Sequence, residues 1–166
     1  KQAGTTYTDR KRFAGYAFQV SSEYDTFIGG WFLGNQTKTL RYGENPHQKA
    51  SFQGNLSSIF HQIHGKELSY NNLLDVEAAL QLIGDFEETT FAIIKHNNPC
   101  GVASANTVFD AWKRALASDP VSAFGGVLVT NGTVDAETAN AIREIFFEVL
   151  IAPQMTPEAI EILSKN

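Results

Sequence analysis

Lys95-His96-Asn97-Asn98-Pro99-Cys100-Gly101 carries most of the information in this sequence, and it follows the apolar run Phe91-Ala92-Ile93-Ile94. The apolar run, bounded by turn formers, predicts a short buried strand. A lysine and a histidine then stand side by side where that strand ends. In open α/β sheets, ligands bind beyond the carboxyl ends of the strands. The stretch is therefore either a ligand-binding loop or a solvated loop with two ordinary polar residues.

Strands and helices alternate from about residue 91 onward. After the first strand we expect a helix at 108–116 ended by Ser118-Asp119-Pro120, a strand at 127–129, a helix capped by Asp135 that carries Ala139, Ile142 and Ile145, a strand at 149–152, and a helix begun by Thr156 and Pro157. This alternation predicts an α/β fold, with a largely parallel sheet and helices packed on its faces.

The part before residue 91 is less regular. Tyr24, Phe27, Ile28, Trp31 and Phe32 share one helical face, with Ser21 or Ser22 as cap, and this aromatic face needs either the core or a neighbour to cover it. The remaining expectations are a frayed polar segment at 1–12, a linker at 34–39, a loop at 40–48, a strand around 50–52, and a loop at 66–72 that feeds a helix with Leu73, Val76, Leu80 and Ile83 on one side and Asn71 or Asn72 as its cap.

Composition narrows the class of protein. The 166 residues are enough for one core, or one core with an appendage, and the net charge of −5 argues against a nucleic-acid binder. No stretch approaches the roughly 20 apolar residues of a membrane span. The single cysteine excludes an internal disulfide and fits a reducing cytoplasm. Because the chain lacks a start methionine and a basic-then-apolar leader, we expect neither a signal peptide nor a natural N-terminus.

Lys95 and His96 suit chemistry on a weak nucleophile. A histidine titrates near neutrality and can accept a proton from an attacking amine. A lysine ammonium can stabilise the oxyanion that forms when that amine attacks a carbonyl. Adjacent residues on a strand point to opposite sides, but a turn at the strand end can direct both toward one pocket. The alternative is a histidine hydrogen-bonded for structural reasons.

Two other stretches carry weaker signals. Arg41 suits bidentate phosphate recognition, and Tyr42 beside it can lie against a heterocycle, although most surface arginines do nothing so specific. Phe124-Gly125-Gly126 precedes a strand, and its glycines let the backbone approach a ligand closely. A simple turn explains the glycines equally well.

Cys100 invites two further hypotheses. As a nucleophile it would have His96 four residues away, but a lone cysteine beside a Pro-Gly turn is more often structural. The zinc deaminase signature needs a second cysteine separated from the first by two residues, and that position here is Ala103. A zinc site of that kind is therefore excluded. His61 and His64 lack a third ligand and are interpreted as surface residues.

Five stretches, taken in order, resemble one family of proteins. They are LRYGENPHQ at 40–48, KELSYNNLLD at 66–75, KHNNPCGVA at 95–103, SDPVSAFGG at 118–126 and EVLIAP at 148–153. We refer to them as motifs 1 to 5. The family is that of the bifunctional purine biosynthesis proteins of bacteria. These combine 5-aminoimidazole-4-carboxamide ribonucleotide (AICAR) formyltransferase with IMP cyclohydrolase.

The resemblance implies a role for each site residue. His96 would be the proton acceptor and Lys95 the transition-state stabiliser. The residues implied in nucleotide binding are Arg41, Tyr42 and Gly125 as direct contacts, Glu148 on the carboxamide, and Asn72 and Phe124 as walls of the pocket. The reaction would move the formyl group of 10-formyltetrahydrofolate to the exocyclic amine of AICAR, with no metal.

The resemblance also implies how the chain is organised. Residues 1–35 resemble the tail of the cyclohydrolase domain with a helical linker, and residues 36–166 resemble the first subdomain of the formyltransferase. That subdomain would be a cytidine-deaminase-like three-layer α/β/α sandwich without the zinc site. The expected partners are AICAR, the folate, the remainder of the parent chain and a second subunit that shares the active site. We therefore expect the isolated fragment to be inactive; the alternative function is a non-catalytic nucleotide-binding module.

Overall fold

The computed structural model describes residues 4–33 and 37–165, which form two compact units. The first unit contains α1 (Tyr7–Phe32), the strands β1 (Thr37–Thr39) and β2 (Ser51–Gln53), and the short 3-10 helix η1 (Leu56–Ser58). The second unit consists of residues 40–50 and the chain from residue 62 onward. All five motifs lie in the second unit.

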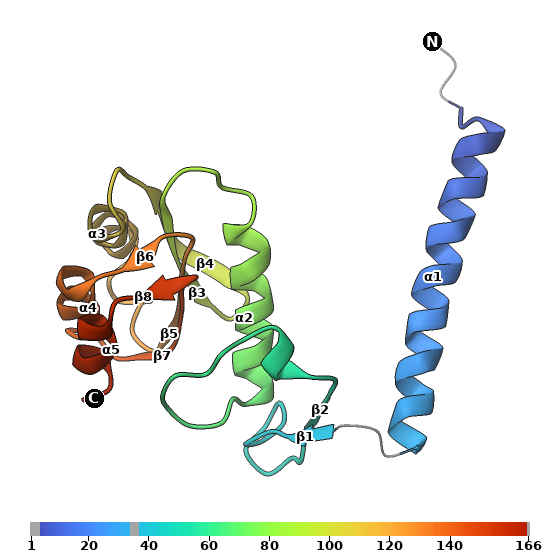
Figure 1. The fold of residues 1–166 in the computed structure, drawn as a ribbon, viewed down its shortest axis with the longest axis horizontal. Helices are drawn as coiled ribbons and strands as arrows, with labels where there is room; N and C mark the ends of the chain where they lie inside the picture. The colour runs from blue at the N-terminus through green and yellow to red at the C-terminus, as the bar shows by residue number, and fades with distance from the viewer. Residues whose placement is uncertain (1–3, 34–36, 166) are drawn as a thin grey trace. The chain divides into compact units, whose positions relative to one another are not determined.

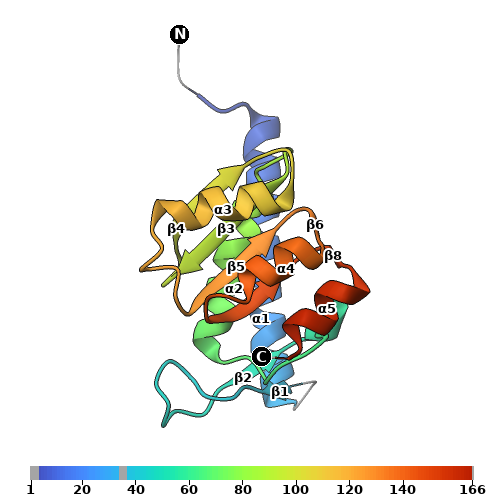
Figure 2. The ribbon, with the colours of Figure 1, turned by 90° about the vertical axis from the view of Figure 1, so that its left-hand side faces the viewer.

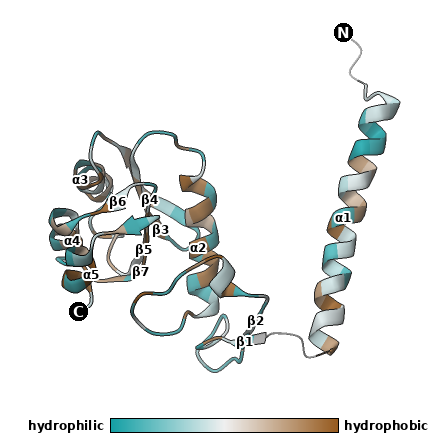
Figure 3. Ribbon diagram, viewed as in Figure 1, coloured by the Kyte–Doolittle hydropathy of each residue, from teal (hydrophilic) through white to brown (hydrophobic). Residues whose placement is uncertain are grey.

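Helix α1 begins earlier than the sequence pattern predicts. Its N-cap is Thr6, whose hydroxyl accepts a hydrogen bond from the Asp9 N–H at 3.1 Å, while the Asp9 carboxylate accepts one from the Thr6 N–H. Because of this capping box, residues 7–12 are helical and not frayed as the sequence predicts. Ser21 and Ser22, the predicted caps, lie inside the helix. Hydrophobic residues recur along α1 (Figure 3), and within its own unit none of its side chains is buried.

Part of the predicted linker is a strand. Thr37–Thr39 pair with β2 in the antiparallel sense, with Lys38 opposite Phe52. In this pairing the backbone groups of β1 bond to β2, whereas those of a linker would bond to water. The polar composition of the segment does not show that such a partner strand exists. Residues 34–36 of the predicted linker lie outside the described residues. The strand expected around residues 50–52 is confirmed as β2.

The second unit contains most of the regular structure. Its elements in chain order are α2 (Tyr70–Ile83), β3 (Thr90–Lys95), β4 (Asn98–Ser104), α3 (Val108–Ser118), β5 (Gly126–Thr130), β6 (Thr133–Val134), α4 (Ala136–Ile142), β7 (Phe147–Ile151), β8 (Gln154–Met155) and α5 (Pro157–Leu163). These confirm the helices and strands expected from residue 91 onward, except that α4 ends before Ile145. The fold is therefore mixed α/β, as the alternation predicts (Figure 1).

The main sheet is mixed, so the prediction of a largely parallel sheet is corrected. Its strand order is β4-β3-β5-β7, and β3 pairs antiparallel with both of its neighbours, whereas β5 and β7 are parallel. The helical crossovers through α3 and α4 make β4, β5 and β7 run the same way, as the alternation implies. Strand β3 is the exception because only His96 and Asn97 separate it from β4, too few residues for a crossover.

The hairpin of β3 and β4 also corrects the placement of motif 3. The residues from Asn98 to Gly101, expected as loop, begin strand β4, and Lys95 pairs with Asn98. Proline is tolerated at position 99 because β4 is an edge strand, where a missing N–H breaks no inner ladder. The end of the sheet at which Lys95 lies is thus the carboxyl end of β3 but the amino end of β4, β5 and β7. The general rule that ligands bind at carboxyl ends does not apply to it.

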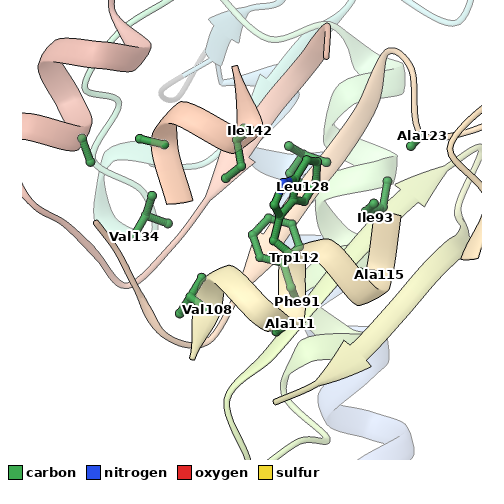
Figure 4. Packing of buried hydrophobic residues seen from close by; sticks show 12 residues of the cluster. Phe91, Ile93, Val108, Ala111, Trp112, Ala115, Ala123, Leu128, Val134 and Ile142 are labelled. Carbon is green, nitrogen blue, oxygen red and sulfur yellow. The ribbon is translucent and has the colours of Figure 1, made fainter. Parts of the chain in front are cut away.

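Helices cover both faces of this sheet. Figure 1 shows α2 on one side and α3, α4 and α5 on the other, and Figure 2 shows α3 and α4 in front of β3 and β5. On the second side Trp112 packs edge-on against Phe91, with ring centroids 5.0 Å apart, and Leu128 joins them (Figure 4). Side chains alternate along a strand, so Ala92 and Ile94 face α2 instead. The inner strands β3 and β5 are thus buried almost throughout, which leaves their ends as the places where their residues reach solvent.

Two searches of the described residues complete the fold. No helix in that part of the chain has both the length and the hydrophobicity to cross a membrane. Within the same residues, no group of three or more histidine, cysteine, aspartate or glutamate side chains is arranged to hold a metal ion.

Candidate functional site

The first turn of α2 is where the five motifs begin to meet. The helix is capped by Ser69, two or three residues before the predicted caps Asn71 and Asn72. Asn72 is instead the third helical residue, and its side chain completes a capping box: Asn72 Oδ1 accepts hydrogen bonds from the Ser69 N–H (3.0 Å) and hydroxyl (2.9 Å). Ser69 is fully buried and Asn72 nearly so. The cap therefore holds the Asn72 amide in one orientation.

That orientation turns the Asn72 Nδ2 group toward motif 5. Nδ2 donates a short hydrogen bond to Oε2 of Glu148, near the start of β7. The two residues are 76 positions apart in the chain. The structure thus brings together two of the residues that the sequence analysis placed in one nucleotide pocket, and it leaves the second carboxylate oxygen of Glu148 available to accept from a ligand.

Motif 1 is tied to the same end of α2. The Arg41 N–H donates to the Leu68 carbonyl and the Tyr70 N–H donates to the Tyr42 carbonyl, both at 3.1 Å. The Arg41 guanidinium lies 4.8 Å from the centroid of the Tyr42 ring and donates one hydrogen bond to its hydroxyl at 3.0 Å. A guanidinium has five N–H donors, so most remain available for an anion. Arg41 is exposed and Tyr42 orients its guanidinium, whose remaining N–H groups can donate to a phosphate.

Motif 4 holds Lys95. The Lys95 ammonium donates a short hydrogen bond to the Phe124 carbonyl. Gly125, the next residue, has φ +70°, and a Cβ at that position would lie 3.2 Å from Lys95 Nζ. Gly125 also donates its N–H to the Phe146 carbonyl at 2.7 Å, and the rings of Phe124 and Phe146 lie 5.5 Å apart. The positive φ favours glycine here, and a side chain would press on the end of Lys95.

His96 stands at the tip of the β3–β4 hairpin. It is exposed, and its φ of 52° lies in the left-handed region, as does the 62° of Asn97. Among the described residues, no hydrogen bond to the His96 imidazole is found, so both ring nitrogens face solvent or a ligand. The turn begins directly after Lys95, whose ammonium is hydrogen-bonded to motif 4, and His96 is its first residue. Lys95 and His96 therefore lie at the same end of the sheet as Glu148 and Asn72. Within the part of the chain that the structure describes, no hydrogen bond joins the Lys95 and His96 side chains.

An open pocket accompanies motif 1. It has a volume of about 400 Å³ and is lined by Gly43, Glu44, Gln48, Lys49, Ala50 and Tyr70. Neither Lys95 nor His96 lines it. This hollow therefore lies beside the loop of motif 1 and not around the Lys95–His96 pair.

Sequence reasoning missed three residues of this network: Ser69, Asp75 and Phe146. Ser69 and Asp75 lie inside motif 2. Serine at the helix start is a recognisable cap signal, and Asp75 is a charge followed one turn later by the apolar Ala78 and Ala79. Phe146 stands two residues before motif 5 and has no pattern of its own. Its contact with Phe124 depends on the parallel pairing of β5 with β7.

Cys100 does not have the surroundings of a nucleophile. It lies half-buried on β4, its thiol points to the Ile93 carbonyl at 3.6 Å, and burial raises the pKa of the thiol above its ordinary value. A raised pKa lowers the fraction of thiolate, which is the reactive form. The structure therefore supports the structural interpretation of this cysteine.

Comparison with known proteins identifies relatives over the whole chain. A family model described as AICARFT/IMPCHase bienzyme matches residues 1–166. A protein of Bacteroides thetaiotaomicron named bifunctional purine biosynthesis protein PurH is 54% identical over 174 aligned residues, which cover 99% of this chain and 34% of that protein. Proteins of the same name from Chloroflexus aurantiacus and Parvibaculum lavamentivorans are 44% and 45% identical and cover 96% and 98% of this chain. The chain spans about a third of the length of these curated relatives.

Proposed function

This chain belongs to the AICARFT/IMPCHase bienzyme family, and we propose that it forms part of the formyltransferase site of a longer, bifunctional purine biosynthesis enzyme. The reaction is transfer of the formyl group of 10-formyltetrahydrofolate to the amine of AICAR, and the same parent protein acts as an IMP cyclohydrolase. The observation that supports this best is the gathering of all five motifs, spread over residues 40–153, into one hydrogen-bonded network at one end of the sheet.

In this proposal His96 and Lys95 perform the chemistry. The AICAR amine is conjugated with its ring and carboxamide, so it is a poor nucleophile. As its nitrogen attacks the formyl carbon, the Lys95 ammonium stabilises the negative charge on the formyl oxygen and His96 accepts the proton that the amine loses. The bond from the formyl carbon to the folate nitrogen then breaks, and that nitrogen takes up a proton. Formyl-AICAR and tetrahydrofolate leave.

The nucleotide is held by the residues around the start of α2. Arg41 binds the phosphate, Tyr42 lies against the nucleotide, and Glu148, positioned by Asn72, accepts from the carboxamide. Phe124 and Gly125 form the wall beside Lys95. An acceptor such as Glu148 suits an amide N–H₂, which distinguishes AICAR from a nucleotide that carries a carboxylate at that place.

The rest of the assembly is also proposed from the family. Residues 1–35 would be the end of the cyclohydrolase domain with its linker, and residues 36–166 the first of two deaminase-like formyltransferase subdomains without zinc. The folate would lie mostly against the second subdomain and a partner subunit of a homodimer in the cytoplasm. Such sharing fits the open pocket of motif 1, which does not enclose the Lys95–His96 pair.

The substitution His96→Ala in the full-length enzyme tests the catalytic role. We expect kcat for formyl transfer to fall by about 100-fold or more, because loss of a general base typically costs that much. The KM for AICAR should change little, since the imidazole makes no contact with the residues assigned to nucleotide binding. The matched control is His64→Ala, which removes an exposed histidine outside the five motifs.

A non-catalytic binding module gives a different result. It would bind AICAR with and without His96, and formyl transfer by the full-length protein would not depend on this residue. Unchanged kcat in the His96→Ala enzyme, with the control also unchanged, would reject the proposed mechanism and favour that alternative.

A further inference from the structure

The peptide group that joins His96 to Asn97 is hydrogen-bonded at both ends. Its carbonyl oxygen, on His96, accepts from Asn98 Nδ2 at 2.8 Å. Its N–H, on Asn97, donates to the Oδ1 atom of Asp75 at 2.7 Å. Asp75 belongs to α2 and is 22 residues away in the chain. A side chain from a different element therefore holds the centre of the hairpin turn.

The orientation of this peptide group determines the type of turn. A two-residue connection with both residues at positive φ is a type I′ turn. A type II′ turn has positive φ at the first residue only and differs mainly by a flip of the central peptide. That flip would point the Asn97 N–H away from Asp75. The hydrogen bond to Asp75 thus favours type I′, and with it the backbone conformation from which the His96 side chain projects.

The hydrogen bond from the Asn97 N–H to Asp75, which we call the clamp, opposes a local conformational cost. A residue other than glycine pays about 1 kcal/mol or more for the left-handed region, and asparagine pays least. His96 at 52° and Asn97 at 62° both pay part of this cost. The Asn97 side chain adds to the clamp when its amide is oriented to satisfy both groups: its nitrogen then donates to the Leu74 carbonyl at 3.3 Å and to Asp75 Oδ1 at 3.0 Å. The tip of the hairpin is bound to α2 through both the backbone and a side chain.

The same face of α2 serves both halves of the site. Asp75 follows Asn72 by three residues, so the two side chains lie one above the other on the helix. Asn72 orients Glu148 on β7, and Asp75 holds the turn that carries His96. The spacing of two side chains on a rigid helix thereby sets the spacing between the carboxylate and the imidazole.

We propose that Asp75 is a positioning residue for His96, which holds the imidazole in its productive place through the Asn97 N–H and does not itself touch substrate. The inference rests on the proposed function, because it gives His96 the role of proton acceptor. It predicts that an acceptor at position 75 matters for the rate of the chemical step, and that the negative charge matters less.

The test uses the full-length enzyme and steady-state formyl transfer from 10-formyltetrahydrofolate to AICAR. Asp75→Leu should lower kcat about tenfold, the usual scale for an orienting partner of a functional side chain, with the KM for AICAR changed less than about twofold. Asp75→Asn keeps an acceptor oxygen and should restore kcat to within about threefold of the wild type. Asp85→Leu, the same change at an exposed aspartate beyond the end of α2, should have no effect.

A double-mutant cycle shows whether Asp75 acts through His96. In the His96→Ala background, with the residual rate measured at high enzyme concentration, Asp75→Leu should cost nothing further. An equal loss in both backgrounds, or an Asp75→Asn enzyme as slow as Asp75→Leu, overturns the inference. If His96→Ala leaves kcat unchanged, the proposed function is wrong, and the inference that rests on it is wrong too. If His96→Ala is inactive and Asp75→Leu is fully active, the inference alone fails.

A second measurement does not depend on any variant folding. With asparagine labelled by ¹⁵N, the Asn97 amide of the unmodified protein should exchange its hydrogen slowly although the turn is exposed. Exchange at the rate of an unstructured amide would show that the bond to Asp75 is not maintained, and would overturn the inference.

Discussion

Lys95 and Gly125 show how much depends on single atoms at this site. The ammonium is held by the Phe124 carbonyl, directly before Gly125. The Phe124 carbonyl accepts from one of the three ammonium N–H groups, and in the proposed function the other two would donate to the developing oxyanion. Gly125 leaves space for the ammonium, because a Cβ atom at this position would lie 3.2 Å from Lys95 Nζ.

Gly125→Ala in the full-length enzyme should therefore displace Lys95 and lower kcat for formyl transfer about tenfold, beyond a stability loss of about 1 kcal/mol from the positive φ. Gly65→Ala is the matched control: its φ is +97°, but a Cβ there meets nothing within 4 Å. It should show the stability loss without the loss of rate. Equal effects of both substitutions on kcat would contradict the role assigned to Gly125.

Among the elements, the helices of the second unit all begin with an N-cap side chain. Each of α2, α3, α4 and α5 begins at a side chain that accepts from a backbone N–H of the first turn; the caps are Ser69, Thr107, Asp135 and Thr156. Asp135 and Thr156 are the caps that the sequence predicts. At α2 the cap has a second role, because the capping box also orients the Asn72 amide toward Glu148.

The cap of α4 gives a prediction on pH. The Thr138 N–H donates to Asp135 Oδ1 at 2.8 Å and lowers the pKa of that carboxyl below its ordinary value of 3.8. A lowered carboxyl pKa adds stability that is fully present above the unfolded value and is lost as the pH falls through the folded value. Asp135→Asn retains the cap but does not titrate, so its free energy of unfolding in urea should stay within about 0.5 kcal/mol of wild type at pH 7. Between pH 4 and pH 3 it should fall less steeply than wild type. The control is Asp85→Asn, which caps no helix; a parallel pH dependence for the Asp135→Asn chain would disprove the assignment.

At the scale of the whole molecule, one helix connects the motifs. Motif 2 contacts motif 1 through Tyr70, motif 3 through Asp75 and motif 5 through Asn72, while motif 4 reaches motif 3 through Lys95. The chain nevertheless spans only about a third of its curated relatives, and the pocket beside motif 1 does not enclose the Lys95–His96 pair.

The isolated chain should consequently fold without catalysing formyl transfer. Its circular dichroism should show the mixed helix and strand content described here, and its turnover of AICAR and 10-formyltetrahydrofolate should not exceed the background measured without protein. The positive control is the full-length enzyme under the same conditions. Robust turnover by the folded chain would show that these residues form a complete site on their own.

The sequence by itself determined most helices and strands from residue 91 onward, and which residue types the motifs carry. Local signals suffice for these: Asp135 and Thr156 cap helices, Pro157 fits a first helical position, and the buried run before Lys95 forms a strand. The order of the five motifs identified the family, which the comparisons confirm over the whole chain. Roles for single residues within the motifs remain predictions that the experiments above address.

Only the tertiary structure decided how the strands run and which side chains meet. A two-residue hairpin at His96 and Asn97 makes β3 antiparallel to its neighbours, because a turn of that length has no room for a crossover. The bonds from Asn72 to Glu148 and from Asp75 to Asn97 join residues 76 and 22 positions apart. Such contacts depend on where a whole helix packs against a sheet, and that packing is set by the summed burial of many apolar side chains, which no local stretch of sequence contains.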